Sequence, residues 1–168
     1  MNKYLIILLT VFNLISYGML SQENIKTNFY KLNIPENTTV KPFAKTHEEL
    51  ANIDAYQFNA DEKPKYIMYL MSNKTNMEIA SINIDNYKDF LFDLGDLKLS
   101  RIENLENKIK INFTYSNKEN IKGVIYMSVK NNILHRFVFL FPNENSIQIF
   151  QNEVDEMINN ITEIKEFW

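Results

Sequence analysis

The chain has 168 residues, of which 45% are hydrophobic and 13% aromatic, so it can bury the core of one domain and is not disordered as a whole. Its formal net charge is −3 and its basic residues do not cluster, which excludes nucleic acid and anionic membrane surfaces as expected partners. It contains no cysteine, so disulfides, sulfur-based zinc sites and an acylated-cysteine anchor are excluded.

The N-terminus has the layout of a secretory signal peptide. A lysine precedes a mostly apolar run over residues 4–15, and small residues follow at Gly18 and Ser21. We expect residues 1–21 to be the leader, cleaved after Gly18 or Ser21, and residues 22–168 to form a single globular domain. An uncleaved anchor is the alternative, but the run is shorter than the ~20 apolar residues that span a membrane. The sequence therefore predicts an exported protein, periplasmic or secreted, that is not a lipoprotein.

A strand and a short helix are predicted next. The segment 29–34 is rich in apolar residues and stops at Pro35, which predicts a strand followed by a turn. Thr46 stands three residues before Glu49, the spacing of a capping box, and predicts a short helix over about 47–55. One of the two histidines, His47, would lie in its exposed first turn.

The middle of the chain predicts a hairpin and a second helix. Residues 65–72 are apolar at odd and even positions, as in a strand covered on both faces, and a polar turn leads into a partner strand over 77–84. Asp85 can cap a helix over about 86–94, whose apolar residues recur at helical spacing and which ends at Gly95.

Residues 108–141 predict an antiparallel meander. The stretch 108–116 alternates apolar and polar residues, which indicates an outer strand, and the loop 116–120 would place Tyr115 opposite Ile121. Paired asparagines at 131 and 132 tolerate the left-handed backbone of a two-residue hairpin turn. That turn sets these facing pairs: Lys130 with Ile133, Ser128 with His135, Met127 with Arg136, Tyr126 with Phe137, Ile125 with Val138, and Gly123 with Leu140. One core face then collects Ile109, Ile111, Phe113, Ile121, Ile125, Met127, Val138 and Leu140, with Phe113 over Gly123.

The C-terminal segment predicts a long amphipathic helix. Its apolar residues recur at helical spacing and cover the core face just described, while Glu153, Asp155 and Glu156 point outward. The predicted fold class is therefore α+β, with an antiparallel sheet that ends in a C-terminal meander and is covered by helices, including the long C-terminal one.

Aromatic residues gather on the opposite face of the meander: Tyr126, Phe137, Phe139 and Phe141. The second helix, over 86–94, is expected to cover them, and a ligand groove or partner patch is the alternative. Trp168 at the C-terminus would close the core or anchor a partner.

His135 and Arg136 are adjacent polar residues that could bind a substrate or take part in catalysis. Neighbours on a strand point to opposite faces, so these two cannot grip one substrate together. Ser128 lies across from His135, the beginning of a nucleophile and base pair, but no nucleophile elbow or oxyanion loop accompanies it. A structural histidine is the preferred interpretation. We expect Arg136 to pair with a carboxylate, and we expect no metal site and no cofactor.

Two further motifs are "YKLNIPEN", residues 30–37, and "FVFLFPNE", residues 137–144, which is followed by an amphipathic helix. Together they resemble the PsbP-like family, whose founding member is an extrinsic subunit of the photosynthetic oxygen-evolving complex. The matching positions are structural ones: Leu32, Ile34, Pro35, Phe139 and Phe141. Thr38 stands where the family has a large aromatic residue. The resemblance implies an accessory or partner-binding role and no catalytic residues.

The functional expectation is an exported, non-enzymatic accessory or protein-binding domain of a bacterial envelope. A small-ligand or lipid binder that uses the aromatic face is the alternative, and a serine hydrolase is a distant third. Residues of the speculative binding face are Tyr126, His135, Arg136, Phe137, Phe139, Phe141 and Trp168.

Overall fold

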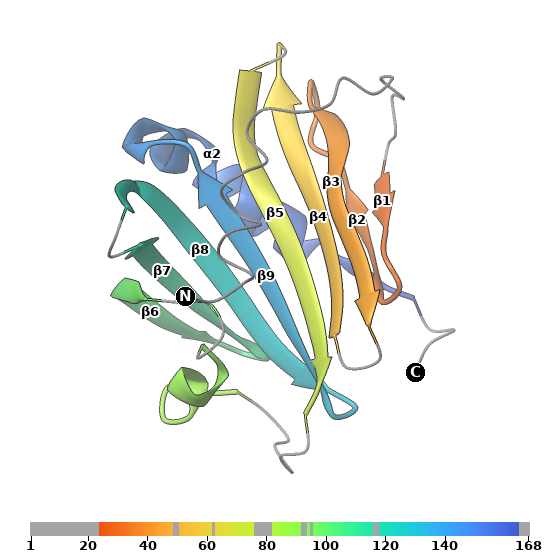
Figure 1. Cartoon of the computed structure of the whole chain (residues 1–168), viewed down its shortest axis with the longest axis vertical. Coiled ribbons are helices and arrows are strands. Elements are labelled where there is room, and N and C mark those ends of the chain that lie inside the picture. Colours follow the sequence, from red (N-terminus) through yellow and green to blue (C-terminus); the bar gives the residue numbers. More distant parts are fainter. Residues whose placement is uncertain are drawn as a thin grey trace.

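The structure, a computed structural model, describes residues 24–48, 51–61, 63–75, 82–91, 94, 96–115 and 118–164. Its strands are β1 (Asn24–Lys26), β2 (Tyr30–Asn33), β3 (Thr39–Glu48), β4 (Ala51–Ala60), β5 (Lys63–Lys74), β6 (Leu97–Leu105), β7 (Lys108–Tyr115), β8 (Lys118–Lys130), β9 (Ile133–Phe141) and β10 (Thr162–Glu163). Helix α2 spans Glu144–Asn159, and η2 is a 3-10 helix over Tyr87–Phe90. A seven-stranded antiparallel sheet runs in the order β3-β4-β5-β9-β8-β7-β6, α2 lies across one of its faces, and β1, β2 and β10 form a small second sheet (Figure 1).

The predicted α+β class is wrong, because the protein is mostly β. Strands make up most of the described residues, in two antiparallel sheets, and α2 is the single α-helix among those residues. Where a helix was expected over 47–55, β3 and β4 form a hairpin, and β4 pairs with β5 on its other side. β4 is paired with a strand on each side, and this tertiary pairing overrides the local capping pattern.

The predicted 65–72 strand is confirmed as β5, but its predicted hairpin partner is not. β5 pairs with β4 on one side and with β9 on the other, so no free edge remains for residues 82–84, and residues 77–81 lie outside the described part. The helix expected over 86–94 shrinks to the four residues of η2, with Asn86 rather than Asp85 at its N-cap. Tyr87 and Phe90 are buried.

The β8–β9 hairpin has the predicted register. All six predicted pairs are present, including Ser128 with His135 and Tyr126 with Phe137. Asn131 and Asn132 adopt φ values of 49° and 60°, the left-handed conformation that a two-residue turn requires. The two asparagines were sufficient to predict this register because both tolerate the positive φ of a two-residue turn.

The prediction that residues 108–116 form an outer strand of the sheet is wrong. β6 pairs along the far side of β7, so β6 and not β7 forms this edge of the sheet. β8 begins at Lys118, which faces Tyr115 across a register shift, whereas the sequence predicted a loop over 116–120 and Ile121 opposite Tyr115. Beyond that irregularity the predicted pairs hold, with Phe113 opposite Gly123.

Each face of the sheet carries a separate core. The C-terminal helix and the helix over 86–94 were each predicted to cover the face that the other one covers in the structure. α2 packs against the aromatic face, where its Val154, Met157 and Ile158 are buried with Phe139 and its neighbours. η2 packs on the other face, with the residues that were expected beneath the C-terminal helix. Both faces of β8 and β9 are apolar, so alternation identifies which residues share a face without saying which element covers it.

Acidic side chains that were expected to point outward attach α2 to the sheet. Glu153 accepts a hydrogen bond from Tyr66 Oη at 2.7 Å and forms an ion pair with Lys65 Nζ at 2.5 Å. Lys65 is buried, its ammonium also donates to Thr38 Oγ1 at 2.9 Å, and it lies 4.9 Å from the centre of the Phe150 ring. A buried ammonium is tolerated only with such partners, so Glu153 determines where α2 docks.

We predict that Gly123→Ala destabilises the protein by about 1–3 kcal/mol, the usual cost of overpacking a core. A Cβ at this position would overlap the Phe113 ring and lie 2.6 Å from the carbonyl oxygen of Phe139. Urea denaturation measures the change. Adding Phe113→Leu should recover part of the loss, because it removes the ring but not the carbonyl contact. A fully tolerated alanine would contradict this packing.

We predict that Glu153→Gln lowers the free energy of unfolding by about 2 kcal/mol, because it leaves the buried Lys65 ammonium without its carboxylate. Glu144→Gln is the matched control on the same helix. Its ion pair with Lys122 is exposed, so we expect a loss of about 0.5 kcal/mol or less. Equal losses in urea denaturation would show that Glu153 does not anchor α2.

Candidate functional site

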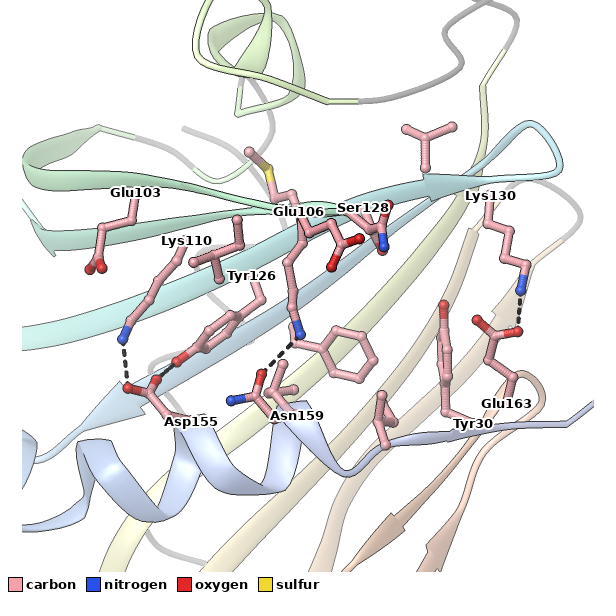
Figure 2. Close-up of a pocket in the computed structure, with 18 residues that line it drawn as sticks. Tyr30, Glu103, Glu106, Lys110, Tyr126, Ser128, Lys130, Asp155, Asn159 and Glu163 are labelled. Carbon is pink, nitrogen blue, oxygen red and sulfur yellow. Dashed lines mark hydrogen bonds and ion pairs between the residues drawn. The ribbon is translucent and has the colours of Figure 1, made fainter.

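The candidate site is a groove of about 810 Å³ between the sheet and the C-terminal end of α2 (Figure 2). Its sheet side is formed by β8, by the start of β7 and by the turn between β6 and β7, and its other side by α2 and the segment that continues into β10. The volume is within the range of small-molecule sites.

The groove has an apolar wall. Tyr126 and Phe137 face each other across β8 and β9, and Ile158 of α2 packs against the same cluster. Ile161 continues this wall beyond the end of the helix. The groove therefore opens from the margin of the main core, where apolar side chains meet polar ones.

Asp155 lies at one end of the groove. Its carboxylate pairs with Lys110 Nζ at 2.7 Å and accepts a hydrogen bond from Tyr126 Oη (Figure 2). Burial raises the pKa of the Tyr126 hydroxyl above its ordinary value, and the bond to the negatively charged Asp155 raises this pKa further. Tyr126 thus stays protonated as a donor, and the three side chains form a fixed polar stop.

At the other end lies the exposed ion pair of Lys130 and Glu163, which joins the β8–β9 hairpin to β10 (Figure 2). Tyr30 lies beside this pair and interacts through its hydroxyl with Ser128. Burial, and then the charge of Glu163, raise the pKa of Tyr30, while the bond to Ser128 lowers it. The two ion pairs therefore bound the groove along its length.

Lys108 lies between these ends and differs from the other two lysines of the groove. Its ammonium donates to the amide oxygen Oδ1 of Asn159 at 3.2 Å, a neutral partner. Burial lowers the pKa of the Lys108 ammonium, and the charge of Asp155 opposes part of that shift. The cation is thus partly desolvated, and no carboxylate among the described residues is bonded to it.

Part of the binding face predicted from the sequence lies in the groove. Tyr126 and Phe137 line it, whereas Phe139 and Phe141 are buried beneath α2 as core residues. Trp168 lies outside the described residues. The polar residues of the groove were not predicted from the sequence: Lys108, Lys110, Lys130, Asp155, Asn159 and Glu163. One signal was available, because Glu153 and Asp155 flank the apolar stripe of α2, where side chains can reach the sheet.

His135 is sealed inside the protein. It is 0% exposed, its Nδ1 lies 3.0 Å from Ser72 Oγ, and the rings of Phe29 and Tyr30 pack edge-on against it at 5.1 and 5.0 Å. Burial lowers its pKa to about 4, and the charge of Lys130 adds to this. Ser128 faces His135 in the register as predicted, but the polar contact to the imidazole comes from Ser72. The imidazole is thus a neutral core group.

Arg136 points to the opposite face and is 1% exposed. Its guanidinium donates to the carbonyl oxygen of Phe90 at 3.2 Å and to Asn73 Oδ1 at 2.9 Å. The sequence predicted that Arg136 lies at the sheet edge, but β9 is the middle strand of the sheet. The expected carboxylate partner stays a prediction. Arg136 therefore ties η2 to the sheet.

Within the described ranges, no three histidine, aspartate or glutamate side chains come together in a way that could hold a metal ion. A search of the same residues finds no helix with the length and apolar character needed to cross a membrane.

Comparison with known proteins gives one partial similarity. No protein-family model matches the chain. A stretch of 137 residues is 31% identical to Protein Ycf2 of Physcomitrium patens, and the match covers 75% of this chain and 5% of Ycf2. Because this chain spans so small a part of Ycf2, the similarity does not assign it a family.

We predict that His135 makes stability depend on pH below neutrality. Its pKa is about 4 in the folded protein against an ordinary 6.5, so the unfolded chain binds a proton first as the pH falls. The neutral imidazole contributes about 3 kcal/mol to the free energy of unfolding. This contribution is complete above pH 6.5 and is lost as the pH falls from 6.5 to 4.

The test compares urea denaturation of the wild type and His135→Asn at pH 7 and pH 4. Asparagine retains a polar atom near the position of Nδ1 but does not titrate, so the variant should lose less stability on acidification. Titration of the His135 imidazole by NMR gives a second readout. A midpoint near 6.5 in the folded protein would contradict the prediction.

Proposed function

We propose that this protein is an exported, non-enzymatic binding domain that holds a small amphipathic ligand in the groove between α2 and β8. The observation that carries the proposal is a groove of about 810 Å³ that has an apolar wall and is bordered at its two ends by ion pairs, Lys110 with Asp155 and Lys130 with Glu163. A groove of this volume suits a small molecule. The leader-like N-terminus supports export.

The lining supports an amphipathic ligand. The groove is lined by apolar side chains such as Phe137 and Ile158 and also by hydroxyl, amide and ammonium groups. Sites of this kind use apolar contact for affinity and a few polar groups for orientation. The buried Ser72 and His135 pair is separated from the groove by the ring of Tyr30, which supports binding rather than hydrolysis.

A protein partner is the second candidate, and one feature of β8 favours it. The pairing of β7 with β8 ends at Ile109 and Met127, but β8 continues to Lys130. On that side, no strand of the described residues pairs with residues 128–130, and an extended segment of a partner could add there. The accessory role implied by the PsbP-like resemblance agrees with this candidate.

The proposal predicts that the full chain, purified gently from the envelope fraction of its own host, carries a small bound mass in native mass spectrometry. Ser128→Trp, which fills the groove from β8, should lose that mass. Ser100→Trp is the matched control, because Ser100 is exposed on β6 outside the groove. Circular dichroism checks folding, and Ser128→Leu provides a milder block. A bare protein would contradict the proposal, and a bound polypeptide would favour the second candidate.

A further inference from the structure

Lys108 differs from the other two lysines that line the groove in the group that its ammonium contacts. Lys110 and Lys130 each contact a carboxylate, Asp155 and Glu163 respectively. Lys108 instead donates to the neutral amide of Asn159. An ammonium held only by a neutral oxygen gains more from an added anion than one that is already paired.

The surroundings of Lys108 suit such an interaction. The side chain is partly buried at the start of β7 while its bond to Asn159 is exposed, so an anion can reach the ammonium from solvent. In the same groove, the partly exposed Ile161 continues the buried wall of Phe137 and Ile158 and can cover a hydrocarbon body. An anionic head and an apolar tail therefore find complementary groups within one site.

The acidic residues of the groove restrict the charge of that head. Glu103 pairs with Arg101 at 3.2 Å, Asp155 and Glu163 pair with lysines, and Glu106 is exposed on the turn between β6 and β7. These carboxylates repel a doubly charged phosphate more than a singly charged carboxylate. A monoanion thus fits the site better than a dianion.

From this arrangement we propose that the ligand is an amphipathic monocarboxylate whose head binds Lys108 Nζ in exchange for Asn159 and whose tail lies against Phe137 and Ile158. This inference rests on the proposed function and adds the chemical class of the ligand. It makes Lys108 the residue that selects an anionic head.

The test uses NMR titration of the full chain with octanoate, 1-octanol and octyl phosphate, which share one tail and differ in the head. Octanoate should shift the resonances of groove residues and bind at least tenfold more tightly than 1-octanol, and more tightly than octyl phosphate. Lys108→Met should abolish that advantage, and Lys108→Arg should retain most of it. Lys98→Met is the matched control, because Lys98 is an exposed lysine of β6 outside the groove.

Equal affinity for octanoate and 1-octanol, or unchanged octanoate binding by Lys108→Met, would overturn the assignment of the head while the groove remains a binding site. Tighter binding of octyl phosphate would overturn the choice of a carboxylate in favour of a phosphate. If no amphiphile shifts the groove residues, the monocarboxylate class is wrong. A bare protein in native mass spectrometry would then remove the proposed function as well.

Discussion

The docking of α2 on the aromatic face of the sheet depends on two carboxylates of one helical turn. Residues of an α-helix are separated by about 100°, so Glu153 and Asp155 lie on either side of the buried Val154. Each carboxylate meets a lysine and a tyrosine of the sheet, from β5 on one flank and from β7 and β8 on the other. Apolar burial supplies the attraction, while the carboxylates set the position of the helix along the sheet.

The groove follows from that position. α2 ends at Asn159, and the chain then turns aside to pair β10 with β2 instead of continuing over β8. The sheet extends past the helix there, and the space between them is lined by apolar residues from the core margin and by charged residues from its rim. Asp155 serves both purposes, because the residue that anchors the helix also lines one end of the groove.

The adjacent His135 and Arg136 show how one strand connects two cores. β9 is the middle strand of the sheet, so alternate side chains enter opposite layers. The imidazole remains neutral among aromatic rings beneath β2, and the guanidinium donates to Phe90 of η2 and to Asn73 of β5. The two polar side chains are therefore buried in different cores, while Lys108 and its neighbours line the groove.

The sequence by itself determined the local features: the β5 strand, the Asn131–Asn132 turn with its register, the Phe113 and Gly123 contact, and helix α2. These depend on period, turn chemistry and side-chain size within short stretches of chain. Only the tertiary structure decided that β3 and β4 form a hairpin, that β6 takes the sheet edge, that α2 covers the aromatic face, and that Lys108 and Asn159 meet. Each of these results from a choice between distant partners that local patterns leave equivalent, because both faces of the central strands are apolar.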